Sequence, residues 1–578
     1  MLEKFLAAKG GFAFERIRYL RMSARAITAY TTLLFVLLYL VPLTMRPIVS
    51  PDESRYGAIA LEMLHSKDWW SLKLVGLSYY EKPPMGYWLT AVSMAVFGEN
   101  AWGLRFAPVL AALFTALATG AIAKRICALP HIGLIATSVQ LTLLFPWVFG
   151  NVAILDGMFS AFITVCVAFF VYGATDPERR WRMFFFTLSG VAAAGAFLTK
   201  GFLGLAFPAI IAGGWLIWQR RWRDLLLYPL VPIISAVIIS APLIIQIHKH
   251  NPGFWDYFFW VEHVRRFTSP DGNQHPEPWW YFLPMLPVGA LLWTLNIGKV
   301  WSGFRTSLFR GRGASLCAVW IALPLLLLSA SSGKLPAYIL PIFPAFSIVI
   351  AISLLNYFSN TPKTLFADQL GRWLLVIVAL LCASFILTGH QWLYADQLWR
   401  DNSTWRFGLL ALALLTWAAL DHWAQRPPVP AHRLMRMAFS PAPLLMIAGL
   451  LLPDALIEKS KIGVETLRAQ SQDLAQSHTL IVDANMATCV AYSTKRFDMT
   501  IIGPGGELDN ELKLPLEQAR FITREQVLAQ VTLAQKTGSV ALVIMRNDLK
   551  AFHAPGAPTP QSELIDGDVS VALFAQAK

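Results

Sequence analysis

Two short motifs in the first hundred residues combine carboxylate, cationic and aromatic side chains. They are DESRY at positions 52–56 and YEKPP at positions 80–84. A carboxylate such as Asp52 can act as a general base or orient sugar hydroxyls, and Lys and Arg are the usual partners of phosphate groups. Two plainer readings stay open: Asp52 only caps a helix, and Glu81 and Lys82 only form an ion pair at a turn. The candidate site residues here are Asp52, Glu53, Arg55, Tyr56, Tyr80, Glu81 and Lys82.

Further charged side chains lie at the ends of apolar runs or in the loops between them. These are Asp156, Lys200, the pair Arg265 and Arg266, and Lys334, which precedes Tyr338 by four positions. A single lysine at the end of a membrane helix is usually an anchor that reaches the membrane surface. Several cations on the external side are unusual, because short external loops are normally poor in Lys and Arg. Together they favour an anion site.

A metal site is possible but is not required by the sequence. Glu81, His263 and His275, with His248 or His250, could supply the oxygen and nitrogen ligands that zinc accepts. Their spacing matches no compact metal motif, and histidines in a solvated loop usually bind no metal. The five cysteines are scattered and form no CxxC pair, so neither a disulfide framework nor a cysteine zinc site is indicated.

The composition places these residues in a membrane protein. The chain has 578 residues, of which 56% are hydrophobic and only 14% are charged, whereas a soluble protein has roughly 25% charged residues. Apolar runs long enough to cross a bilayer recur through most of the chain. The net charge of +13 does not indicate nucleic-acid binding, because the basic residues form short clusters between apolar runs, where they set membrane orientation.

About thirteen spans are expected. The apolar runs fall at 27–45, 103–123, 132–149, 157–174, 182–198, 202–218, 225–247, 280–298, 314–330, 337–356, 373–389, 406–423 and 437–453. The run 27–45 is longer than the apolar part of a cleaved signal peptide and follows a basic segment, so we read it as the first membrane helix.

The positive-inside rule orients the chain. If the short run 83–98 is interfacial or re-entrant, every strongly basic short loop falls on the cytoplasmic side. The loop 46–101, with an amphipathic helix near 52–66, is then periplasmic, as are the loop 248–279 and the tail 454–578. We therefore expect a bacterial inner-membrane protein whose active site and C-terminus face the periplasm.

These patterns predict an all-α polytopic membrane domain over 1–453 and a small soluble α/β periplasmic domain over 454–578. The second prediction rests on strand-like segments at 479–482, 499–502 and 540–544 and on a helical pattern at 524–535. The expected site, with carboxylates, cations and aromatics at a membrane face, suits a substrate that carries phosphate, sugar and a lipid tail.

Over roughly residues 25–350 the chain resembles the GT-C glycosyltransferases, in particular the protein O-mannosyltransferase-like branch. Within it, the closer resemblance is to the 4-amino-4-deoxy-L-arabinose transferases of lipid A. The motifs that carry this resemblance are DESRY at 52–56, YEKPP at 80–84, LDG at 155–157, LTKG at 198–201, HVRRF at 263–267 and SGKLPAY at 332–338.

The resemblance implies a donor, undecaprenyl phosphate carrying aminoarabinose, and an acceptor, a lipid A phosphate. It also implies resistance to polymyxin and other cationic peptides. It makes Asp52 the catalytic carboxylate and gives Asp156 an assisting role in the sugar site. Lys82, Arg55, Arg265 and Tyr338 would hold the donor phosphate.

The same residues leave two alternative functions open. One is a mannosyl- or glycosyltransferase that uses a polyprenyl-phosphate donor and acts on protein or on another glycan. The other is a transporter of lipid-linked sugar, which should instead have charges near the bilayer midplane and two related halves.

An acceptor phosphate is already ionised near pH 7, since its second pKa is about 6. Such an acceptor hardly needs a base, so Asp52 would rather orient the acceptor or pair with the ammonium of the amino sugar.

Overall fold

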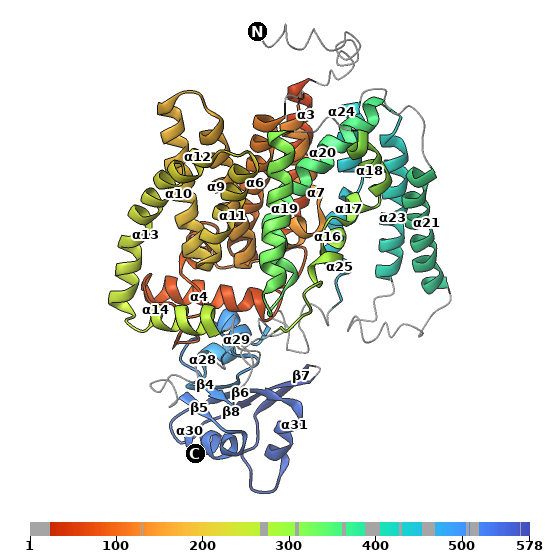
Figure 1. Ribbon diagram of the computed structural model, residues 1–578. Helices are drawn as coiled ribbons and strands as arrows, with labels where there is room; N and C mark the ends of the chain where they lie inside the picture. The colour runs from red at the N-terminus through yellow and green to blue at the C-terminus, as the bar shows by residue number, and fades with distance from the viewer. Residues whose placement is uncertain are drawn as a thin grey trace, which may run out of the picture.

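The structure, a computed structural model, has a broad bundle of long helices and, beside one end of it, a smaller domain built on a sheet (Figure 1). The described residues are 23–127, 129, 131–265, 275–306, 311–360, 366–387, 405–426, 430–453, 467, 469–503, 508, 520–566 and 568–577.

Nine helical segments among the described residues are long and apolar enough to cross a membrane. They are Ala24–Thr44 (α3, η2 and η3), Ala101–Ile126 (α6), Leu155–Thr175 (α9), Arg179–Lys200 (α10), Trp222–His250 (α12 and α13), Arg312–Ala330 (α19), Pro336–Ser359 (η6 and most of α20), Trp405–Ala424 (α23) and Pro430–Leu451 (α24 and α25). The pair α7 (Ile132–Thr142) and α8 (Leu144–Gly150) would be a tenth, bent by 68°. The chain is therefore a multi-pass membrane protein.

The predicted number of thirteen spans is not confirmed, although each predicted run coincides with helix. Two predicted spans, 202–218 and 373–389, fall on helices that are not among the nine segments above, namely α11 (Leu203–Trp218) and α21 (Phe366–Leu387). The predicted single span 280–298 is wrong, because the chain there forms three short helices, α16 (Phe282–Gly289), α17 (Leu291–Thr294) and α18 (Ile297–Thr306). Pro287 inside α16 lacks the N–H that a continuous helix needs.

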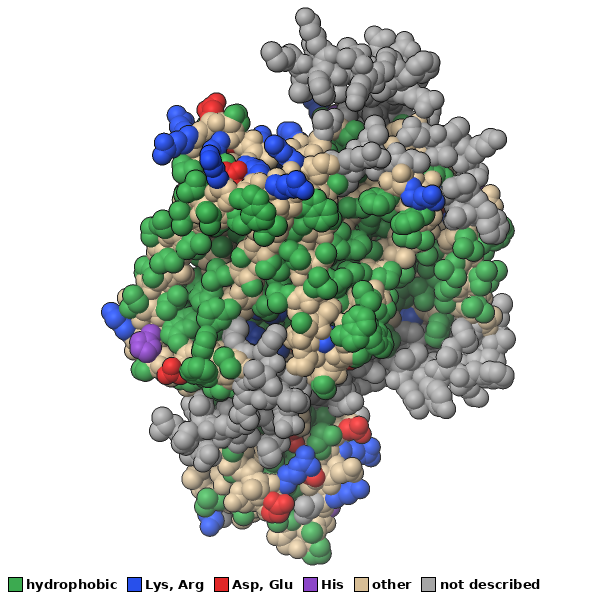
Figure 2. All heavy atoms as spheres, in the orientation of Figure 1, with side chains coloured by type: hydrophobic (Ala, Val, Ile, Leu, Met, Phe, Trp, Pro, Cys, Tyr) green, Lys and Arg blue, Asp and Glu red, His purple; other side chains and the backbone are tan. Residues whose placement is uncertain are grey.

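The two ends of the bundle differ in charge. On the face shown in Figure 2, large apolar side chains cover the middle of the bundle, and Lys and Arg gather at the end away from the sheet domain. That end carries α12 (Trp222–Leu227), which follows Arg220 and Arg221, and α24 (Pro430–Phe439) with Arg433 and Arg436 (Figure 1). The segregation matches the one expected from the positive-inside rule.

The loop between the first two spans forms structure at the opposite end of the bundle. It contains α4 (Asp52–Ser66), a hairpin of β1 (Lys73–Leu74) and β2 (Leu77–Ser78), and α5 (Met85–Phe97). The predicted amphipathic helix near 52–66 is thus confirmed. At 13 residues, α5 is about 20 Å long, which is too short to cross a hydrocarbon layer about 30 Å thick. A second loop segment forms α14 (Phe254–Asp256) and the π-helix η4 (Tyr257–Arg265).

The C-terminal domain is a mixed six-stranded sheet in the order β5-β4-β3-β6-β8-β7. Strands β3 to β6 pair in parallel, while β8 pairs antiparallel with both β6 and β7. The three predicted strands and the predicted helix are confirmed, and β5, β7 and β8 are additional. The elements are α28 (Ser471–Gln476), β3 (Thr479–Asp483), α29 (Ala487–Thr494), β4 (Thr500–Ile502), β5 (Phe521–Ile522), η11 (Arg524–Gln526), α30 (Val527–Ala534), β6 (Val540–Met545), α31 (Arg546–Leu549), η12 (Lys550–His553), β7 (Ser562–Asp566) and β8 (Val569–Phe574).

The C-terminal domain packs directly on the first loop. Helix α29 lies against α4 (Figure 1), and buried apolar side chains of α4, the hairpin and the sheet belong to one continuous core. The ring of Tyr492 passes so close to Gly57 that a Cβ atom there would lie 2.6 Å from it. At the hairpin turn, Arg520 donates a 2.8 Å hydrogen bond to the carbonyl of Val75.

We predict that Gly76→Ala weakens this junction. Gly76 has φ +78, and a Cβ atom would lie 2.4 Å from the Arg520 guanidinium and 2.5 Å from the Phe497 carbonyl. The control is Gly556→Ala, since Gly556 has φ +84 with open space around it and so incurs the backbone strain without the clash. Thermal unfolding and limited proteolysis should show an extra loss of about 2 kcal/mol for Gly76→Ala. Equal losses of stability in Gly76→Ala and Gly556→Ala would contradict this prediction.

Candidate active site

Helix α4 presents Asp52 in its first turn. The N-cap is Pro51, so the expectation that Asp52 itself caps the helix is wrong. The side chain of Asp52 is 36% exposed, and its Oδ1 lies 3.7 Å from a guanidinium nitrogen of Arg55, one turn along the helix. A carboxylate at a helix N-terminus is also favoured by the helix dipole. Asp52 therefore lies at a surface that a substrate can reach, beside the guanidinium group of Arg55.

Glu53 has a structural role instead of the predicted substrate contact. Its side chain is fully buried between Arg46 and Arg105 and accepts hydrogen bonds from both guanidinium groups, at 2.7–2.9 Å. It also accepts from the backbone N–H groups of Val49 and Ala153. Burial alone would raise the pKa of Glu53, but the attraction of Arg105 and Arg46 and their hydrogen bonds hold it well below its usual value. Glu53 thus stays ionised and joins α4 to the start of α9.

Two tyrosine hydroxyls lead to Glu81 of the YEKPP motif, and a ring contact joins them to Tyr56 of the DESRY motif. Tyr87 donates to Tyr79 at 3.2 Å, and Tyr79 donates to the carboxylate of Glu81 at 3.3 Å. Burial, and then the charge of Glu81, raises the pKa of Tyr79 well above its ordinary value, so this phenol remains a donor. The Tyr56 ring lies 5.7 Å from that of Tyr87 and 5.0 Å from the guanidinium carbon of Arg55.

Lys82 reaches across to the second loop. Its Nζ lies 2.9 Å from Oε2 of Glu262 on η4 and donates to the carbonyl of Glu81 at 3.0 Å. Tyr80 packs its ring edge-on against Phe254 and Tyr257 of the same segment. The 254–262 part of the second loop therefore lies against the YEKPP motif. Glu262 is a residue that the sequence analysis missed, because nothing in its own neighbourhood marks it as the partner of a lysine 180 positions away.

Three predicted residues from three distant segments meet at the same end of the bundle. Lys200, at the end of α10, forms an ion pair and hydrogen bond with Asp156, at the start of α9. The Lys200 nitrogen also lies 4.2 Å from the ring centroid of Tyr338 in η6. The side chains of Asp156 and Lys200 are 13% and 12% exposed. This arrangement is a partly buried polar cluster in an otherwise apolar wall.

The side chain of Lys334 is buried. Its ammonium donates to the carbonyls of Glu277, at 2.8 Å, and of Ser331, and burial lowers its pKa. Its backbone N–H donates to the carbonyl of His275, and Pro276 and Gly333 form a β-bridge. Lys334 thus fastens the 331–334 turn to the end of the second loop, a role that the sequence did not predict.

The predicted zinc ligands are only partly described. Glu81 is buried and His275 is exposed, but the side chains of His263 and Arg265 lie outside the described residues, as does all of Arg266. Within the described part of the chain, no three His, Cys, Asp or Glu side chains come together in a way that could hold a metal ion. Zinc binding by Glu81, His263 and His275 stays a prediction.

Three of the candidate cations each lie beside a carboxylate and are mostly shielded from solvent. Arg55 lies beside Asp52, Lys82 beside Glu262 and Lys200 beside Asp156. These cations are between 12% and 19% exposed, so an incoming phosphate could reach them by displacing a carboxylate. Charge-assisted hydrogen bonds of this kind are the strong ones. The site can therefore bind an anionic group at the membrane face and stabilise negative charge on a leaving group.

Comparison with known proteins identifies relatives over nearly the whole chain. Residues 24–258 match the family described as dolichyl-phosphate-mannose-protein mannosyltransferase, and residues 458–573 match the arabinosyl transferase ArnT C-terminal domain. An undecaprenyl phosphate-alpha-4-amino-4-deoxy-L-arabinose arabinosyl transferase of Erwinia tasmaniensis is 32% identical over 94% of this chain and 98% of its own. The protein of the same name from Pseudomonas aeruginosa is 30% identical over 96% and 100%.

The fold also has a solved counterpart. The crystal structure of ArnT from Cupriavidus metallidurans bound to undecaprenyl phosphate superimposes with a TM-score of 0.73. It covers 96% of this chain and 98% of that one, at 22% sequence identity. The apo structure of the same protein gives 0.74. The predicted GT-C fold, an all-α membrane domain with a small C-terminal α/β domain, is confirmed.

We predict that Glu53→Gln destabilises the protein strongly. The substitution removes the one negative charge between two buried guanidinium groups, and breaking a buried ion pair in this way costs about 3–5 kcal/mol. The measurement is thermal unfolding in detergent, with Glu563→Gln as the control, because Glu563 is an exposed residue on β7 that lies 3.3 Å from His553. A Glu53→Gln protein as stable as the control would show that the network contributes little.

Proposed function

The chain belongs to the family of undecaprenyl phosphate-alpha-4-amino-4-deoxy-L-arabinose arabinosyl transferases, and we propose that it transfers aminoarabinose from undecaprenyl phosphate to a phosphate of lipid A. The observation that supports this best is the convergence of Asp52, Arg55, Lys82, Asp156 and Lys200 at one end of the bundle, each cation beside a carboxylate. A lipid-linked donor would enter from the membrane at that level.

The orientation belongs to the same proposal. The basic end of the bundle faces the cytoplasm of a bacterial inner membrane, because Lys and Arg accumulate in cytoplasmic loops. The end with α4 and the C-terminal domain then faces the periplasm. Attachment of a positively charged sugar to lipid A would reduce its negative charge, and with it the attraction of polymyxin and other cationic peptides.

In the reaction, an acceptor phosphate oxygen forms a bond to the anomeric carbon of the sugar. The bond between that carbon and the donor phosphate oxygen breaks, and undecaprenyl phosphate leaves with the electron pair. Arg55, Lys82, Arg265 and Tyr338 would hold the donor phosphate, and the cations would stabilise its growing charge. Lys200 and Asp156 would face the sugar.

Asp52 acts on an acceptor that already carries its nucleophilic charge. A general base would abstract nothing from an ionised phosphate, so the role left to Asp52 is orientation. Its exposed carboxylate can pair with the ammonium group of the amino sugar and so fix the anomeric carbon relative to the acceptor. Such positioning contributes through the orientation of reacting groups.

The donor phosphate must compete with Glu262 for Lys82. Because the Lys82–Glu262 pair is 2.9 Å long and Glu262 is almost fully buried, we expect Lys82→Ala to raise the KM for the lipid-linked donor about tenfold. Glu262→Gln should instead lower that KM severalfold, since the lysine would no longer be neutralised. Glu178→Gln, an exposed carboxylate at the other end of the bundle, should leave it unchanged. A raised KM in Glu262→Gln would show that the pair itself, rather than free Lys82, binds the donor.

The decisive test is the mass of lipid A from a polymyxin-sensitive strain that lacks its own transferase and expresses this chain. We expect an aminoarabinose mass increment with the parent, its loss with Asp52→Ala, and its retention with Asp473→Asn, an exposed carboxylate on α28. A different sugar mass on lipid A, or glycosylated protein with unmodified lipid A, would overturn the donor or the acceptor while leaving a glycosyltransferase. Transport of the lipid-linked sugar without any product would overturn the class.

A further inference from the structure

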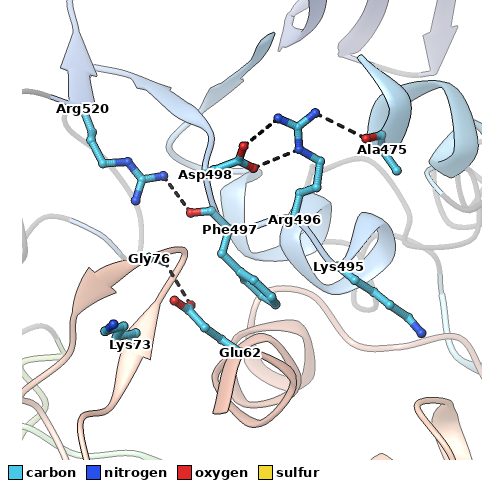
Figure 3. A pocket seen from close by; sticks show the side chains of 9 residues that line it. All are labelled: Glu62, Lys73, Gly76, Ala475, Lys495, Arg496, Phe497, Asp498 and Arg520. Atoms are coloured by element: carbon cyan, nitrogen blue, oxygen red, sulfur yellow. Dashed lines mark hydrogen bonds and ion pairs between the residues drawn. The ribbon is translucent and has the colours of Figure 1, made fainter. Parts of the chain in front are cut away.

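A cleft of about 750 Å³ lies where α4 and the β1–β2 hairpin meet the C-terminal domain. Helix α4 and the hairpin contribute Glu62, Lys73 and Gly76, and the C-terminal domain contributes the rest (Figure 3). Glu62 follows Asp52 by ten positions on α4, which corresponds to about 15 Å along the helix axis. The cleft is therefore separate from the reaction site. We call it the junction cleft; its lining residues from the C-terminal domain are Ala475, Lys495, Arg496, Phe497, Asp498 and Arg520.

Cations outnumber carboxylates in the junction cleft. Lys73, Lys495, Arg496 and Arg520 face Glu62 and Asp498. Arg496 is paired with Asp498 through two hydrogen bonds of 2.9 Å. Lys495 pairs with Glu99, which is not among the lining residues, so Lys495 and Arg496 each already have a carboxylate partner. In Figure 3 the amino groups of Lys73 and Lys495 point to opposite sides and bond to none of the other residues drawn.

Arg520 makes the cleft a built feature rather than a chance gap. Its guanidinium donates to the carbonyls of Val75, Phe497 and Met499, at 2.6–2.8 Å. These bonds fasten the hairpin to the segment just before β4 and hold the guanidinium plane in place. A guanidinium held in one plane and a lysine in the same cleft are the two kinds of cation that proteins use to bind phosphate.

Glu62 is the one buried carboxylate in this positive cleft. It is 6% exposed and accepts a 3.0 Å hydrogen bond from the N–H of Gly76. Burial raises the pKa of Glu62 to about 7, although Gly76, Lys73 and Arg520 act in the opposite direction. Lys495, Arg496 and Asp498 face the same space from the C-terminal domain. A protonated Glu62 can donate to an anion, whereas an ionised one repels it.

We propose that the junction cleft binds a phosphate group carried by a sugar or by a lipid headgroup, with Lys73 and Arg520 as its main contacts and Glu62 facing the same space. The chemistry required is a compact, strongly accepting oxyanion of charge one or two. The volume admits the phosphate together with an attached saccharide.

Sulfate is the first probe, because it stays a dianion between pH 6 and pH 8 and its own titration cannot imitate that of Glu62. Full-length protein in phosphatidylcholine nanodiscs should bind sulfate more tightly at pH 6 than at pH 8. Glu62→Gln should bind equally well at both pH values and more tightly than the parent at pH 8. Lys73→Ala should weaken binding about tenfold, while Lys536→Ala, an exposed residue elsewhere in the C-terminal domain, should not.

The position of the bound ion distinguishes this cleft from the reaction site. Hydrogen exchange should slow at 73–78 and 495–498 when sulfate binds, and Lys82→Ala should retain that protection. Two further arms identify the source of the phosphate: soluble glucose 1-phosphate, and nanodiscs that contain phosphatidic acid. Protection by either arm supports the proposal and names the source. Binding that survives Lys73→Ala, or that disappears with Lys82→Ala, would overturn it, as would pH dependence that persists in Glu62→Gln.

Discussion

The buried pairing of one carboxylate with two guanidinium groups is the constraint on which the site depends. Glu53 accepts from Arg46, Arg105 and two backbone N–H groups. Arg105 also donates to the carbonyls of Leu43 and Pro47. In a poorly polarisable interior such bonds are strong, and an unpaired charge would be very costly. The network therefore allows one arrangement of the first span, α4, α6 and the 151–153 segment.

This constraint acts directly on the two acids of the candidate active site. Asp52 is the residue before Glu53, and the N–H of Ala153, which bonds to Glu53 at 2.9 Å, lies three residues before Asp156. One buried side chain thus fixes two carboxylates that are about a hundred positions apart in the sequence. Each of them then neutralises a cation, Arg55 or Lys200, at the edge of the membrane. Pairing with a carboxylate lowers the energetic cost of placing each cation near the hydrocarbon layer.

Sequence patterns predicted features that depend on local order. Apolar runs predicted the helices, the strand-like segments 479–482 and 540–544 predicted two central strands, and the limits of the apolar runs placed Asp156 and Lys200 at span ends. They failed where a long-range partner decides the role. Glu53 and Asp52 are adjacent acids with the same local surroundings, and only the burial of Arg46 and Arg105 separates a structural residue from an exposed one. Glu262 likewise depended on a contact with Lys82, 180 positions away. The 280–298 break is different, because Pro287 is visible in the sequence but lies inside a long apolar run.

The contact between α29 and α4 explains why the C-terminal domain cannot behave as a loosely tethered tail. Ser50, just before α4, lies 2.6 Å from the sulfur of Cys489, and Ser54 lies 3.3 Å from the hydroxyl of Thr488. All four side chains are buried, and the Tyr492 ring fills the space that Gly57 leaves open. Close-packed interiors transmit displacement rather than absorb it. Any movement of the C-terminal domain must therefore move the first turn of α4, and with it Asp52, unless this packing is first broken.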